Sequence, residues 1–117
     1  MNEIKRSGTN GRRAQSVEFN GVLYTAGITS SDLAGDITAQ CSDIFSVIEG
    51  ILARAGSSKN RILSANITLA DMEADYGTFN AAWDLWVVDG FEPVRSVTGG
   101  ALAVPEYKVK ISVIAAL

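Results

Sequence analysis

The apolar residues between positions 37 and 69 change their spacing once, and this change constrains the fold more than any other feature. From 37 to 52 they recur at intervals of three and four, which predicts a helix with a single buried face. Asp36 is placed to cap this helix and Gly56 to end it. From Leu63 to Leu69 apolar and polar residues alternate, as in a half-buried strand. A helix and a strand that each bury one side predict an α+β domain.

The rest of the chain supplies the other elements of such a domain. Asn20-Gly21, which suits a tight type I′ turn, separates two short apolar runs and predicts a hairpin. Asp71 caps a second predicted helix that ends at Asp89-Gly90. Its apolar stripe is aromatic: Tyr76, Phe79, Trp83 and Trp86. Strands are expected at 95–98 and 107–116. The expected fold is a mixed sheet with two helices on one face, and a ferredoxin-like domain of the acylphosphatase kind is the competing topology.

The last predicted strand is apolar on both sides at its far end. Val113 and Ala115 alternate with Ile114 and Ala116, so each face of the strand carries apolar residues. Two helices can cover only one of these faces. In so short a chain we expect a second copy of the protein to cover the other, which predicts a homo-oligomer.

Composition limits the class of protein. A length of 117 residues predicts a single domain, 1–117. The formal net charge of −3 argues against a nucleic-acid binder. With no histidine and only Cys41, neither a metal site, a Ser-His-Asp site nor a cofactor is expected. The charged segment Met1–Arg6 is unlike a secretory signal, and no apolar run is long enough for a bilayer, so no membrane partner and a cytoplasmic location are expected.

Arg95 is the candidate binding residue. It follows a turn and Pro93-Val94 and begins a predicted strand. Its guanidinium is always charged and offers a planar fork of donors that fits a carboxylate or a phosphate. On residue type alone, an exposed surface arginine is the plainer interpretation.

An ordered set of short segments along nearly the whole chain resembles the RidA (YjgF) family of imine and enamine deaminases. The segments are Tyr24-Thr25-Ala26-Gly27, Asp36 with Gln40, Ala55-Gly56-Ser57, Ile67 to Met72, Phe79 to Trp83, Pro93-Val94-Arg95-Ser96 and Tyr107 to Ile111. The resemblance implies a chorismate-mutase-like subunit in a homotrimer with clefts between subunits. It also implies hydrolysis of 2-imino and enamino acids to 2-keto acids and ammonia, hence a small carboxylate-bearing metabolite as substrate.

The resemblance also implies roles for single residues. Arg95 matches the arginine that holds the substrate carboxylate. Ala26 and Gly27 match the segment that lines the cleft. Asn80 matches a frequent helix asparagine, whose alternative role is a helix-to-loop hydrogen bond, and Arg13 falls where better-known members have a cleft tyrosine.

Lys110 departs from the family pattern. The deaminases proper have a glutamate here, proposed to activate the hydrolytic water, whereas a lysine ammonium has only donors. Two functions therefore stay open. One is a deaminase in which other groups position the water. The other is a protein on the same fold that lacks this activity and uses Arg95 and Lys110 for a more anionic small molecule. A ribonuclease or translation inhibitor, as some relatives are described, is disfavoured by the acidic charge.

Overall fold

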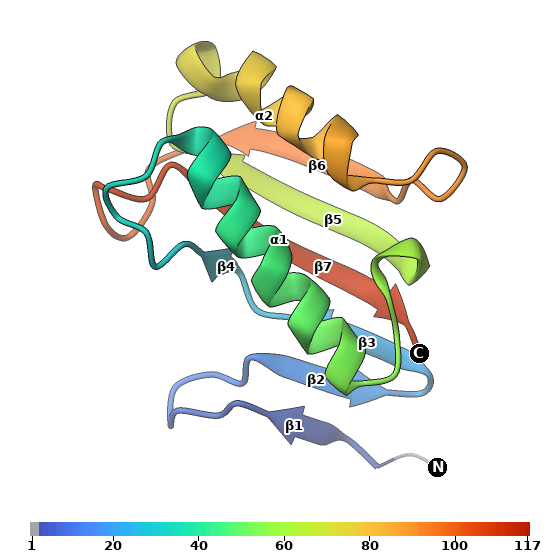
Figure 1. The fold of residues 1–117 in the computed structure, drawn as a ribbon. Helices are drawn as coiled ribbons and strands as arrows, with labels where there is room; N and C mark the ends of the chain where they lie inside the picture. Colours follow the sequence, from blue (N-terminus) through green and yellow to red (C-terminus); the bar gives the residue numbers. More distant parts are fainter. Residues whose placement is uncertain (1–2) are drawn as a thin grey trace.

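The computed structural model describes residues 3–117, and Met1 and Asn2, the start of the charged segment considered above, lie outside them. Two long helices and a short 3-10 helix accompany a mixed sheet (Figure 1). In chain order the elements are β1 (Lys5–Ser7), β2 (Ser16–Phe19), β3 (Val22–Thr25), β4 (Ile28–Thr29), α1 (Ile37–Arg54), η1 (Lys59–Arg61), β5 (Ile62–Leu69), α2 (Met72–Trp86), β6 (Val94–Gly99) and β7 (Val109–Ala116).

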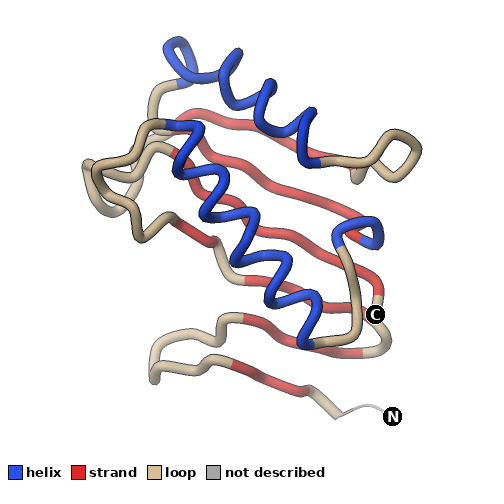
Figure 2. The backbone as a smooth tube through the Cα atoms, in the orientation of Figure 1, coloured by secondary structure: helices blue, strands red, loops and turns tan. Residues whose placement is uncertain are grey.

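The described strands form one 7-stranded sheet in the order β1-β2-β3-β7-β5-β6, with β4 paired to β7. Only β5 and β6 run parallel among the registered pairs. Both long helices lie on the same face of the sheet, which Figure 2 shows in a single view. The prediction of a mixed sheet with two helices on one face is therefore confirmed, and neither helix is long and apolar enough to cross a membrane.

The helix limits follow from local chemistry. The Asp36 carboxylate accepts the backbone N–H of Ala39 at 2.9 Å and so caps α1. Asp71 does the same for α2 through the N–H of Ala74, at 3.0 Å. Gly56 follows α1 with a φ of 80°, in the left-handed region that glycine adopts without strain. The predicted caps are thus confirmed.

The strands and helices agree with the sequence in outline and differ from it in several details. Asn20 and Gly21 have positive φ, as the predicted hairpin between β2 and β3 requires. Leu63 was expected inside, but a register irregularity at the start of β5 turns Ile62 inward and leaves Leu63 50% exposed. Tyr76 was expected on the buried stripe of α2 but is 42% exposed, because it lies about two turns before Trp83, the first aromatic residue of α2 that contacts Phe45 of α1. The last strand begins at Val109 rather than at 107.

A buried glutamine ties α1 to the segment that leads into β7. Gln40 is fully buried, and its amide nitrogen donates to the carbonyls of Gly35 (3.2 Å) and Glu106 (3.0 Å). Its amide oxygen accepts the N–H of Lys108 at 2.9 Å. A buried amide with all these partners satisfied holds the chain in register just before Lys110.

The face of the sheet away from the helices is apolar at one end. There, Tyr24 pairs with Ile114 and Val22 with Ala116. Tyr24 is 44% exposed, while the alternate positions, such as Leu23, are buried against the helices. This sheet face has no covering layer within the described chain.

Candidate functional site

Arg95 lies on β6, the strand at one edge of the sheet, and faces the helices. Its parallel partner on β5 is Ala65, which is buried in the helix-facing core. The guanidinium meets α2 there. Nη2 donates to Oδ1 of Asn80 at 2.7 Å, and the guanidinium carbon lies 5.8 Å from the ring centre of Phe79 and 5.4 Å from that of Trp83. These contacts fix the fork between a strand and a helix.

The second terminal nitrogen of Arg95 is unused. Among the buried side-chain nitrogen and oxygen atoms of residues 3–117, only Nη1 of Arg95 has no hydrogen-bond partner. A buried charged donor without a partner is costly, so such atoms call for an explanation. Nη1 therefore keeps an unused hydrogen-bonding capacity within the described chain.

Gly27 and Lys110 form a second cluster. β4, which directly follows Gly27, pairs with β7 at Thr29 and Lys110. A Cβ atom placed on Gly27 would lie 2.8 Å from Cδ of Lys110, so the lysine stem covers the space that any larger residue would fill. The glycine therefore allows Lys110 to lie flat against the backbone.

Arg95 and Lys110 occupy opposite faces of the sheet. Val109 and Ile111, the neighbours of Lys110, are buried toward the helices, so Lys110 points the other way and is exposed. Arg95 points toward α2. Within one chain the two cations therefore do not face a common space.

The other two candidates are less closely associated with these clusters. The N–H of Ala26 donates to the carbonyl of Gln15 at 2.8 Å, which anchors the segment just before Gly27. Arg13 is exposed on the loop between β1 and β2, and its Nη1 donates to the carbonyl of Gly8 at 2.9 Å. Within one chain, the structure thus pairs Arg95 with Asn80 and Gly27 with Lys110, and records no contact between Arg13 and either pair.

Comparison with known proteins places the whole described fold in one family. The profile of the family described as Endoribonuclease L-PSP matches residues 4–117. The chain is 38% identical to the RutC family protein YoaB of Escherichia coli K12, over 97% of this chain and 98% of that protein. It also matches a crystal structure of a YjgF family member from Neisseria meningitidis, with a TM-score of 0.92, 35% identity and coverage of 98% and 95% of the two chains.

The chain belongs to the RidA (YjgF) family. The fold also matches the crystal structure of an uncharacterized protein from Pseudomonas aeruginosa, with a TM-score of 0.94, 33% identity and coverage of 97% and 98% of the two chains. The match settles the competing topology in favour of the RidA-type fold.

Two contacts of Arg95 in this RidA-family protein were not predicted from the sequence. Phe79 and Trp83 were interpreted as core residues, and both are buried, yet both rings also contact the Arg95 guanidinium. Phe79 and Trp83 flank Asn80 on α2, and this spacing was the sequence signal that could have indicated the contacts.

Trp83 also borders a hollow of about 290 Å³, whose lining includes Asp84, Asp89 and Glu92. Three carboxylates repel a further carboxylate, so this hollow is not a suitable place for a carboxylate ligand.

Cys41 does not contribute to the chemistry of the site. Its side chain is fully buried on α1, and burial raises the pKa of the thiol to about 12, with a smaller contribution from the Asp75 charge. The neutral thiol is therefore the form present near neutral pH. Within residues 3–117, no three Cys, Asp or Glu side chains converge in a way that could hold a metal ion.

Proposed function

We propose that the protein hydrolyses reactive 2-imino acids, with their enamine tautomers, to 2-keto acids and ammonia. The observation that carries the proposal is the Arg95 guanidinium, in which one nitrogen is held by Asn80 and the other is buried without a partner. A substrate carboxylate supplies the missing acceptor and gains a charge-assisted hydrogen bond. The substrate is then held by the group that does not react, which leaves its C=N bond free.

The reaction itself needs one water. Water adds to the imine carbon, and the resulting carbinolamine loses ammonia, so that C=N is replaced by C=O with no oxidant or cofactor. Holding the substrate and the attacking water in a reactive orientation can accelerate such a step without a strong base. Lys110 stands where the family pattern has a glutamate, so backbone groups near Ala26 and Gly27 are the proposed means of positioning the water.

We place the complete site between two copies in a homotrimer. Arg95 and Lys110 lie on opposite faces of one sheet, so only neighbouring copies can bring Arg95 close to Gly27 and Lys110. The uncovered apolar sheet face around Tyr24 and Ile114 supports association. Light scattering should give three times the chain mass of 12.4 kDa, and a monomer at assay concentration would contradict this arrangement.

The function is tested with an amino-acid oxidase that generates the imine in place. Semicarbazide traps the imine as an ultraviolet-absorbing semicarbazone, and the proposed activity lowers that signal by removing the imine first. Alanine-, leucine-, methionine- and phenylalanine-derived imines cover a range of side-chain sizes. If none of these signals falls in the presence of the protein, while a known deaminase lowers them, the proposal is wrong.

A second candidate rests on Lys110. With a lysine in place of the glutamate, Arg95 of one copy and Lys110 of another present two positive charges, which favours a dicarboxylate or a phosphorylated metabolite. Such ligands should raise the melting temperature, because they bind only the native state. The shift should disappear in Lys110→Ala. Unchanged shifts in that variant would rule the second candidate out.

A further inference from the structure

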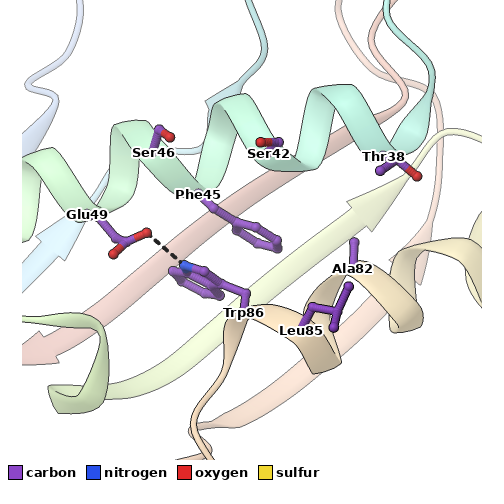
Figure 3. Close-up of a pocket in the computed structure, with 8 residues that line it drawn as sticks. All are labelled: Thr38, Ser42, Phe45, Ser46, Glu49, Ala82, Leu85 and Trp86. Atoms are coloured by element: carbon purple, nitrogen blue, oxygen red, sulfur yellow. Dashed lines mark hydrogen bonds between the residues drawn. The ribbon is translucent and has the colours of Figure 1, made fainter.

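The helical surface carries a groove on another side of α2 from the Arg95 contacts. It lies between α1 and α2 and has a volume of about 310 Å³ (Figure 3). Arg95 contacts α2 through Phe79, Asn80 and Trp83, whereas the groove takes Ala82, Leu85 and Trp86 from that helix. The full lining is Thr38, Ser42, Phe45, Ser46, Glu49, Ala82, Leu85 and Trp86.

The two walls of the groove differ in chemistry. The α1 wall is polar: Thr38, Ser42 and Ser46 recur every fourth residue along one side of the helix, and Glu49 continues the row. Each is exposed. Hydroxyl oxygens and a carboxylate are acceptors, so this wall can receive hydrogen bonds along its length.

The α2 wall and the floor are apolar. Leu85 is 90% exposed, the highest value among the exposed large hydrophobic residues of the described chain. The floor is formed by Phe45 and Trp86, whose rings stack with centres 4.2 Å apart and planes within 3°. An exposed leucine above a stacked aromatic pair offers a flat apolar surface to a second flat group.

Glu49 gives the groove its charge. Its Oε2 accepts the indole N–H of Trp86 at 3.0 Å, as Figure 3 shows, and this bond orients the carboxylate along the groove. No hydrogen bond or ion pair to Oε1 is found among residues 3–117. Lys59 approaches Trp86, but its ammonium donates to the Trp86 carbonyl at 2.7 Å and does not line the groove. The groove therefore carries one negative charge and no compensating cation from the residues that line it.

We propose that this groove binds a small organic ammonium with a flat apolar body. The body lies against Leu85 and the Phe45–Trp86 pair. The ammonium donates to Oε1 of Glu49 and to the hydroxyl of Ser46, one turn away on the same helix face. The inference is independent of the proposed deaminase activity, because it uses none of the residues assigned to that activity.

The test follows the two tryptophan indole N–H signals of the ¹⁵N-labelled full chain during titration with 2-phenylethylammonium. Trp86→Phe assigns them. The Trp86 signal should move in a saturable way, and the Trp83 signal should move less. The anion 3-phenylpropionate, which has a similar body, should leave the Trp86 signal in place.

Two variants make the test specific. Glu49→Gln removes the charge but keeps an amide oxygen that can accept the Trp86 N–H, and it should weaken binding by about threefold to fivefold, as for an exposed ion pair. Glu106→Gln makes the same charge change outside the groove and should have no effect. Ser42→Phe fills the groove and should abolish the shift.

Three results would overturn the proposal. The first is the absence of a saturable shift of the Trp86 signal with the ammonium. The second is an equal response to the anion or in Glu49→Gln, which would show that charge plays no part. The third is a larger shift of the Trp83 signal, which would place binding beside Arg95 instead.

Discussion

Oδ1 of Asn80 lies 2.7 Å from Nη2 of Arg95, so a neutral helix residue holds a charged strand residue without cancelling its charge. A carboxylate at position 80 would form an ion pair with the guanidinium. The amide instead fixes the fork and leaves the guanidinium without an ion pair, and Nη1 without a hydrogen-bond partner, among residues 3–117.

This relationship predicts that two substitutions at position 80 weaken substrate binding to different degrees. Asn80→Ala frees the guanidinium and should lower kcat/KM for 2-imino acids about tenfold, since a hydrogen bond to a charged group is lost. Asn80→Asp should be as stable as the wild type in urea, or more so, yet bind the substrate carboxylate more weakly than Asn80→Ala. Equal activity in Asn80→Asp and the wild type would show that the charge of Arg95 is not used.

Lys110→Glu should restore the group that the family pattern has at this position. We expect a rise in the rate of imine hydrolysis of about a hundredfold, the lower end of what a positioned general base contributes. The matched control is Lys108→Glu, which makes the same charge change two residues earlier and should leave the rate unchanged. A rate that does not rise in Lys110→Glu would mean that water activation in this protein depends on other groups.

The contact between Gly27 and Lys110 predicts a measurable coupling. Gly27→Ala alone introduces a Cβ 2.8 Å from the lysine stem, which offsets the usual gain of a Gly→Ala change. In a Lys110→Ala background the space next to Gly27 is open. There, the effect of Gly27→Ala on the free energy of unfolding should be more favourable by about 1 kcal/mol than in the wild type. A double-mutant cycle of urea unfolding measures this coupling free energy between positions 27 and 110. A coupling of zero would mean that the two side chains avoid each other.

Cys41 predicts a loss of stability at high pH. Its pKa is raised from 9.0 to about 12 in the folded chain, so below pH 9 both states carry the neutral thiol and its contribution is fully present. Above pH 9 the unfolded state ionises first, and stability should fall by about 1.4 kcal/mol per pH unit up to pH 12. Lysines and tyrosines also titrate there, so the difference between wild type and Cys41→Ala isolates the thiol. Parallel pH profiles would contradict the prediction.

The elements that could be predicted from sequence are those with strong local signals. α1 combines a long apolar stripe with the Asp36 cap, and the β2–β3 hairpin has the two residues that accept positive φ. The strands β1 and β4 are only three and two residues long, and they exist because neighbouring strands pair with them. Such strands have no periodicity of their own to detect.

The sequence indicated candidate site residues one at a time but not how they are arranged. The type of Arg95 indicated what it can bind, and the resemblance indicated which ligand. Its bond to Asn80, and the opposite orientation of Lys110, depend on sheet register, which joins residues far apart in the chain. The irregularity at Ile62 and Ser64 shows how one extra residue changes which side chains share a face.

The amide of Gln40 has one further consequence. It recognises only main-chain atoms of Gly35, Glu106 and Lys108, so the identities of the side chains at those positions do not enter the contact. Substitutions of the side chains at Glu106 and Lys108 should therefore leave these hydrogen bonds in place. The position of β7 thus depends on one buried side chain of α1 rather than on the side chains of the segment that leads into the strand.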